Sequence, residues 1–131
     1  MIRIITDSAA DLTAQDLAQP GVYAVPMSIT FEDGSSVEDD GRMTKDEFFQ
    51  RLATDSKLPR TSQPSPAAFI EAFADAELAG DEAIVITVGQ KLSGTYQCAV
   101  MASGEVDTPV YVVDSETATQ GEAMILREAL R

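Results

Sequence analysis

The chain has 131 residues, of which 44% are apolar, and it carries a formal net charge of −13. This size and composition suit one globular domain with a core built mainly from aliphatic side chains. The acidic surface repels phosphate backbones and anionic headgroups, so it argues against nucleic-acid binding and peripheral membrane binding.

Histidine is absent from the sequence, and Cys98 is the only cysteine. A Ser-His-Asp triad, a histidine-ligated zinc site and an internal disulfide are therefore excluded within this chain. A reducing cytoplasm suits this cysteine content best. The N-terminus lacks the pattern of a signal peptide, and the longest apolar run, residues 83–88, is too short for a membrane span. We expect a cytoplasmic protein without stable membrane insertion.

The first third of the chain predicts two strands, separated by a helix that begins after Thr13. Residues 2–6 form a short β-branched run that is typical of a buried strand. Residues 22–31 predict the second strand, in which Pro26 indicates an edge position or two pieces joined at a kink. A turn signal at residues 33–34 then predicts a small β-hairpin.

The middle of the chain carries two helix starts. Thr44 is followed three residues later by Glu47, which is the spacing of a capping box. Ser65 is a candidate N-cap, and Pro66 occupies the first helical position after it. We therefore expect helices over residues 44–54 and 65–78.

The last part alternates strands at residues 83–88 and 110–114 with helices at 92–103 and 119–131. Strands that alternate with helices predict an α/β fold with a mostly parallel sheet flanked by helices. The small β-hairpin is an insertion in this pattern. We expect a single α/β domain over residues 1–131, which stops inside its final amphipathic helix.

Small polar side chains follow three of the predicted strands. In an open parallel sheet, ligands bind beyond the carboxyl ends of the strands. The residues at these ends are Thr6, Asp7 and Ser8 for the first strand, residues 89–95 for the strand at 83–88, and Asp114 and Ser115 for the strand at 110–114. Asp7 and Asp114 are equally well explained as caps of the helices that follow them.

Two hydroxyl-rich turns predict a shared anion site. In the segment LSGTYQ, Ser93, Gly94 and Thr95 lie at a helix start, where free N–H groups and the helix dipole favour an anion. A plain N-cap serine also explains this turn. In the segment TSQPS, Thr61 and Ser62 lie between two prolines, which restrict the backbone and pre-order these donors.

Five segments together resemble the motifs of the DegV family of fatty-acid-binding proteins, which includes the carrier subunits of bacterial fatty-acid kinase. They are IITDSAADL, VPMSITFEDG, FFQRLATDSKLPRTSQPSPAAF, LSGTYQCAVMA and VDSETATQGEAM. The resemblance implies that the chain binds a long-chain fatty acid and that Thr61 and Ser93 hold its carboxylate, with the Gly94 region close by.

The resemblance also implies a partner. A separate ATP-dependent kinase subunit would phosphorylate the bound fatty acid, giving an acyl phosphate for phospholipid metabolism. The carrier itself would be no enzyme and would need no cofactor or metal.

The chain departs from the family pattern in its length. It covers only the N-terminal half, so the C-terminal domain is absent, and so is a histidine that the family places near the carboxylate. The acyl groove is then expected to be open, or to need a partner chain to close it. Five side chains are candidates for the remaining groove wall, with core packing as the alternative: Ala67, Ala68, Phe69, Phe73 and Met101.

Two other functions are compatible with the sequence. Asp7 at the end of a strand is a candidate for an aspartate-based, Mg²⁺-dependent phosphotransferase or phosphatase, and the acidic run at residues 38–41 is a candidate cation ligand. The usual second acid two residues after the first is missing, and surface acids are ordinarily just solvated. A non-catalytic interaction module is the other alternative, with the hairpin or Cys98 as its contact, although we expect Cys98 to be buried.

Overall fold

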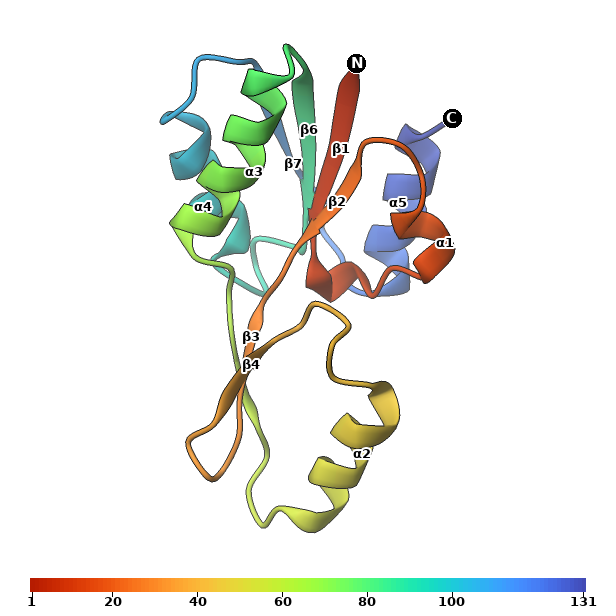
Figure 1. Ribbon diagram of the computed structural model, residues 1–131, viewed down its shortest axis with the longest axis vertical. Coiled ribbons are helices and arrows are strands. Elements are labelled where there is room, and N and C mark those ends of the chain that lie inside the picture. Colours follow the sequence, from red (N-terminus) through yellow and green to blue (C-terminus); the bar gives the residue numbers. More distant parts are fainter.

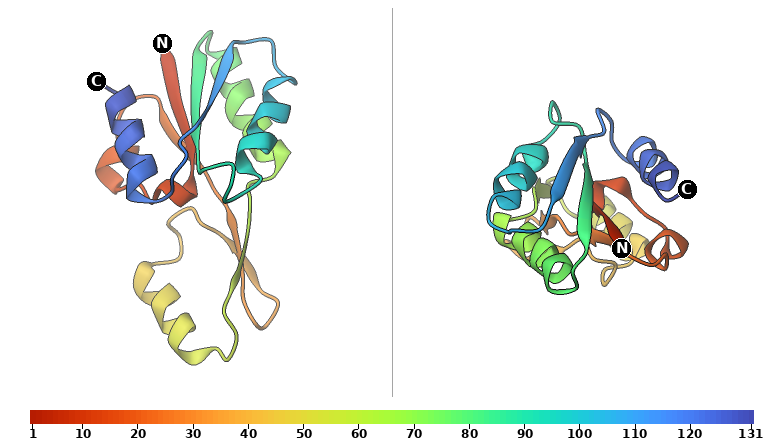
Figure 2. Two further views of the ribbon diagram at one scale, coloured as in Figure 1. Left: turned by 180° about the vertical axis from the view of Figure 1, so that it is seen from behind. Right: turned by 90° about the horizontal axis from the view of Figure 1, so that it is seen from above.

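The computed structural model describes residues 1–131, and its main body is a parallel sheet between two helical layers (Figures 1 and 2). The sheet has four strands in the order β2-β1-β6-β7. These are β1 (Ile2–Asp7), β2 (Val22–Val25), β6 (Glu82–Thr87) and β7 (Val110–Asp114). All three strand pairs are parallel, so the predicted α/β fold with a mostly parallel sheet is confirmed.

Helices cover both faces of this sheet (Figure 2). One face carries α3 (Pro66–Leu78) and α4 (Thr95–Ser103). The other carries α5 (Gln120–Ala129), α1 (Ala14–Leu17) and the short 3-10 helix η1 (Ser8–Ala10). No helix in this fold combines the length and the apolar character that crossing a bilayer needs.

An inserted subdomain extends away from the main body (Figure 1). It contains the antiparallel sheet β4-β3-β5 and the helix α2. Its elements are β3 (Ser28–Thr30), β4 (Ser36–Glu38), α2 (Lys45–Thr54) and β5 (Arg60–Ser62). The β3-β4 hairpin was predicted, and the expected break near Pro26 separates β2 in one sheet from β3 in the other.

The strand β5 corrects the sequence prediction, which treated residues 61–65 as a stiff turn. Thr61 pairs with Ile29 of β3, and Ser62 pairs with Ser28. Three polar residues near two prolines carry no strand periodicity of their own. Pairing with β3 therefore fixes their conformation, which is a tertiary effect.

Most predicted helix starts are confirmed in detail. Thr13 and Thr44 each form a capping box, and Ser65 caps α3 with Pro66 at its first turn. The start of α4 differs, because Gly94 rather than Ser93 occupies the N-cap and provides no side-chain cap.

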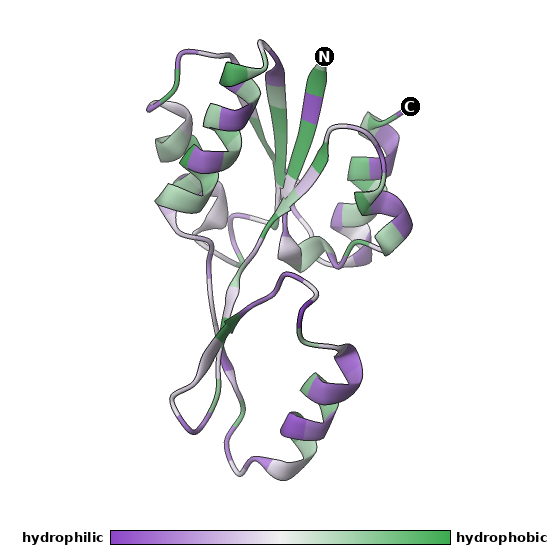
Figure 3. Cartoon of the chain, in the orientation of Figure 1, coloured by the Kyte–Doolittle hydropathy of each residue, from purple (hydrophilic) through white to green (hydrophobic).

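Phe69 and Phe73 of α3 fill the main core and are fully buried beside Ile5 and Val85. Core packing is therefore the correct reading of these two residues, which leaves them unable to line an acyl groove. Met101 is 64% exposed on α4. Figure 3 shows apolar residues concentrated on the central strands, whereas α2 is largely hydrophilic.

A pair of acidic side chains is buried at the carboxyl end of the sheet. Asp7 and Glu122 are both 0% exposed, and Glu122 lies in the first turn of α5. Thr6 Oγ1 lies 2.9 Å from Glu122 Oε1. Burial, and then the neighbouring charge of Asp7, raise the pKa of Glu122 to about 9, and burial also raises the pKa of Asp7. Glu122 is therefore protonated at neutral pH.

This pair predicts a stability that falls as pH rises. Between the ordinary glutamate value of 4.5 and about 9, the folded chain holds a proton on Glu122 that the unfolded chain releases. The free energy of unfolding should then decrease with pH, by up to ~1.4 kcal/mol per unit. Glu122→Gln should flatten this dependence, measured by urea unfolding from pH 5 to 9.

The absence of histidine keeps this pH window free of imidazole titration. Glu128→Gln is the matched control, because Glu128 lies on the same helix with 71% of its side chain exposed. It should follow the wild type. Equal slopes in the wild type and Glu122→Gln would contradict the assignment of the proton to Glu122.

Candidate functional site

The loop that follows β6 is fixed at its base by three elements. Val88 N donates to Asp7 Oδ2 over 2.7 Å, at the end of β1. Gly89 N donates to the Thr117 carbonyl over 2.7 Å, and Gln90 N donates to Asp114 Oδ1 over 3.1 Å. Three successive N–H groups of this loop thus donate to acceptors in β1, in the loop after β7 and at the end of β7.

The alternative reading of Asp7 and Asp114 as structural caps fits these contacts. Asp7 also accepts the N–H of Ala9 over 3.0 Å and caps η1. Asp114 accepts the N–H of Glu116 over 2.9 Å, and this contact lowers its pKa. A nucleophilic aspartate must be reached by its substrate, whereas Asp7 is fully buried with both oxygens occupied.

The loop leads to the N-terminus of α4, which is open to an anion. The first-turn N–H groups of this nine-residue helix have no intrahelical partners, and Gly94 supplies no side-chain cap for them. Ser93 Oγ and Thr95 Oγ1 lie 2.9 Å apart, and Thr95 N donates to Ser93 Oγ over 3.3 Å. Ser93 is half-buried and Thr95 is buried. Hydroxyls and the positive end of the helix dipole therefore gather at one place.

The second hydroxyl-rich segment crosses this helix end. The side chain of Gln63 lies directly against Gly94, where an added Cβ would collide with Gln63 Oε1. One residue later, the Pro64 carbonyl accepts the Cys98 thiol over 3.4 Å. The structure thus brings the TSQPS and LSGTYQ segments together, and a side chain at position 94 would displace the Gln63 amide from this contact.

Gln63 is a site residue that sequence reasoning missed. It directly follows Thr61 and Ser62, which were selected for their hydroxyls. Its orientation toward Gly94 depends on the path of β5 across the molecule. The sequence signal for this contact was the presence of a glycine at one helix start and a glutamine in the other motif.

Thr61 faces a different hollow, which lies under α2. This cavity has a volume of about 320 Å³. The apolar part of its lining is formed by Met27, Ile29, Met43, Phe48 and Phe49, and the acids Asp11, Glu38 and Asp39 also line it. Lys45 reaches the same cavity and forms an ion pair with Asp11 over 3.2 Å. Ser93 is not among its lining residues, and Ser62 is exposed.

These apolar residues were also missed by sequence reasoning. They come from the link before β3, from β3, from the loop before α2 and from α2 itself, so no single periodic pattern marks them. Phe49 remains 59% exposed although it belongs to this lining. An exposed aromatic beside half-buried aliphatic side chains is typical of an incompletely covered ligand surface.

Two features selected as alternatives have structural roles. In the acidic run at residues 38–41, Arg42 contacts Asp40 at 2.6 Å and Glu38 at 3.5 Å, so these acids are paired. Cys98 is buried, as expected, and burial raises the pKa of its thiol. A buried, protonated thiol is a poor contact surface and a poor nucleophile.

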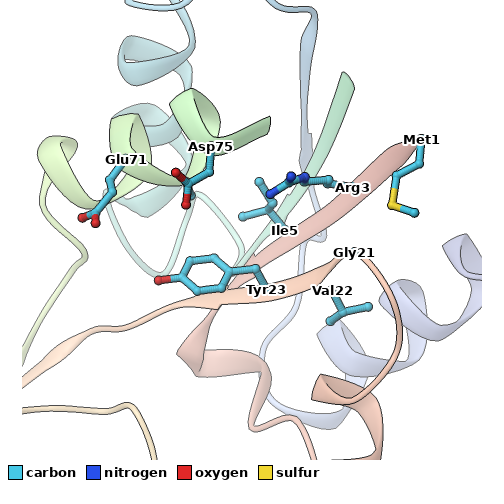
Figure 4. Close-up of a pocket in the computed structure, with 9 residues that line it drawn as sticks. Met1, Arg3, Ile5, Gly21, Val22, Tyr23, Glu71 and Asp75 are labelled. Atoms are coloured by element: carbon cyan, nitrogen blue, oxygen red, sulfur yellow. The ribbon is translucent and has the colours of Figure 1, made fainter. Parts of the chain in front are cut away.

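A further groove of about 400 Å³ lies between β1, β2 and α3 (Figure 4). Its polar lining includes Tyr23, Glu71 and Asp75, and burial followed by these two carboxylates raises the pKa of Tyr23. Its two cations, Arg3 and the N-terminal ammonium of Met1, are both held by Asp81, over 2.9 Å and 2.7 Å. This groove repels anions and contains none of the predicted site residues.

Comparison with known proteins agrees with this fold. A family model described as "Uncharacterised protein, DegV family" matches residues 1–131. A DegV domain-containing protein of Caldanaerobacter subterraneus is 38% identical over 131 residues, which cover 99% of this chain and 46% of the relative. A protein of Thermotoga maritima that is named a fatty acid-binding protein is 37% identical over 135 residues, with coverage of 98% and 46%.

A solved structure is similar over the whole length of this chain. The stearic acid-binding protein of Eubacterium ventriosum superposes with a TM-score of 0.92 at 31% identity, covering 100% of this chain and 47% of that protein. The chain spans about half the length of the curated relatives it matches. On these matches, this chain belongs to the DegV family.

Proposed function

We propose that this chain binds a long-chain fatty acid and holds the carboxylate where the TSQPS and LSGTYQ segments meet. The observation that carries the proposal is the contact between Gln63 and Gly94, because it joins both hydroxyl-rich segments at the open start of α4. Ser93 and Thr95 supply hydroxyls there, and Thr61 and Ser62 lie on the strand that leads into Gln63. In a chain with a net charge of −13, such local donors are what an anion requires.

The acyl chain would lie against the apolar cavity under α2. Met27, Met43 and Phe48 offer it a surface next to Thr61, and each methylene buried there contributes about 0.8 kcal/mol. The volume of about 320 Å³ is small for a ligand pocket, for which ~300–1,000 Å³ is usual. The other half of the length seen in the relatives would then supply the rest of the acyl wall.

The bound fatty acid would be presented to a separate ATP-dependent kinase subunit, which would convert its carboxylate into an acyl phosphate. Ser62, Gln63 and Gly94 are exposed, so a carboxylate at this position stays within reach of a second protein. The fatty acid-binding name of the Thermotoga maritima relative supports a binding role. In this proposal the chain carries its ligand and leaves phosphoryl transfer to the partner.

Removal of either hydroxyl should weaken binding. Thr61→Ala and Ser93→Ala should each raise the Kd for palmitate by about 10-fold, since a hydrogen bond to a charged group contributes ~1.5–3 kcal/mol. Calorimetric titration measures this effect. Ser103→Ala, at the other end of α4, removes only a bond to the Val100 carbonyl and should bind as the wild type does. Unchanged affinity in both test variants would refute the carboxylate site.

Gly94→Ala tests whether the two segments must meet. The new methyl group would displace the Gln63 amide, so palmitate affinity should fall while the helix itself remains folded. Gly104→Ala is the matched control at the opposite end of α4, where a Cβ would meet only the Met101 carbonyl at 3.4 Å. Gly104→Ala should leave affinity unchanged. Equal affinities for the two alanine variants would show that contact between the segments is irrelevant to binding.

A further inference from the structure

The buried oxygen Glu122 Oε2 has no hydrogen-bond partner among ordinary donors. Asp7 directly follows Thr6 in β1 and is fully buried like Glu122, and burial and then the charge of Asp7 raise the pKa of Glu122. Two carboxylates buried at the same place cannot both stay ionised in a dry environment, whereas one shared proton turns this repulsion into a hydrogen bond. The burial of both groups and the unpaired Glu122 Oε2 therefore favour a proton shared between Asp7 and Glu122.

The surrounding contacts place this proton on Glu122. Asp7 accepts two backbone N–H groups, those of Ala9 and Val88, which stabilise its charged form. Glu122 accepts no backbone N–H. Thr6 Oγ1 lies 2.7 Å from the Ile86 carbonyl and 2.9 Å from Glu122 Oε1, and its single hydrogen is shared between these acceptors. Glu122 is thus the donor of the pair, and Asp7 is the acceptor.

No cation neutralises the pair from the elements packed around it. On β1, the only other charged group is Arg3, which is held by Asp81. On α5, Arg127 is held by Asp16 over 2.8 Å. Asp114 at the end of β7 is committed to the N–H groups of Gln90 and Glu116. The η1 helix has no charged residue.

We propose that Glu122 is a positioning residue for the ligand site, whose proton holds Asp7 in place and thereby fixes the loop that carries Ser93 and Gly94. This inference rests on the proposed function, because it concerns affinity at the same site. The connection is short: Glu122 Oε1 lies 2.9 Å from Thr6 Oγ1, and Thr6 directly precedes Asp7 in β1. Asp7 accepts Val88 N over 2.7 Å, and Val88 begins the segment that ends at the start of α4.

Loss of the proton should loosen this chain of contacts. When pH rises past the pKa of Glu122, about 9, a second negative charge appears beside Asp7. Repulsion then pushes Asp7 away from Val88 N, and the loop loses one of its three anchors. Fatty-acid affinity should therefore fall at alkaline pH, although a fatty-acid carboxylate is already ionised at neutral pH.

The test compares palmitate binding at pH 7 and pH 10 in the wild type and in Glu122→Gln. Glutamine keeps a donor toward Asp7 at every pH, so the variant should bind equally at both. The wild type should bind about 10-fold more weakly at pH 10, the effect of ~1.4 kcal/mol. Glu128→Gln, on the same helix and exposed, should reproduce the wild-type loss. Circular dichroism at each pH verifies that the chain is folded.

A second readout needs no ligand. The amide proton resonance of Val88 reports its bond to Asp7, so it should titrate at alkaline pH in the wild type and stay constant in Glu122→Gln. A Val88 resonance that ignores pH would overturn the inference, and so would equal pH profiles for palmitate in both proteins. Absence of palmitate binding at every pH would instead refute the proposed function, while the Val88 titration still decides how the loop is held.

Discussion

Three consecutive backbone N–H groups, those of Val88, Gly89 and Gln90, are held by three separate parts of the chain. Because β1, β6 and β7 are parallel, their carboxyl ends meet at one edge of the sheet, and acceptors from β1, from β7 and from the loop after β7 reach the loop after β6. This anchoring determines where α4 begins and where Ser93 and Gly94 lie. The position of the proposed ligand site follows from it.

The site also shows how an acidic protein can offer a place to an anion. Its field as a whole repels carboxylates, and the groove lined by Glu71 and Asp75 is a clear example (Figure 4). At the start of α4, by contrast, helix N–H groups and the hydroxyls of Ser93 and Thr95 lie together. The acids that do lie behind the loop, Asp7 and Asp114, are turned toward backbone N–H groups.

The inserted subdomain adds an apolar surface to this polar site. It is attached through β3 and β5, and β5 leads directly from Thr61 into Gln63 and α3. Residues on α2 and β3 thus form an apolar surface beside Thr61 without belonging to the main sheet. A fatty acid has one charged end and one long apolar end, and the proposed function assigns the polar site to the first and this apolar surface to the second.

Much of this structure was predictable from the sequence because its causes are local. The apolar runs of β1 and β6, and the capping boxes at Thr13 and Thr44, each depend on neighbouring residues alone. The strand β5, the Gln63–Gly94 contact and the lining under α2 depend on segments distant in sequence, so periodicity could not reveal them. Glu122 left one signal, since it lies four residues before the buried Leu126 and therefore on the same helix face.

The location of the bound carboxylate is the central claim, and an amide NMR titration with palmitate tests it most directly. The proposed site predicts that the largest shifts occur at residues 61–63 and 93–97, with smaller shifts along α2 from the acyl chain. Shifts concentrated around Arg3, Tyr23 and Glu71, or spread without a maximum at the start of α4, would contradict it.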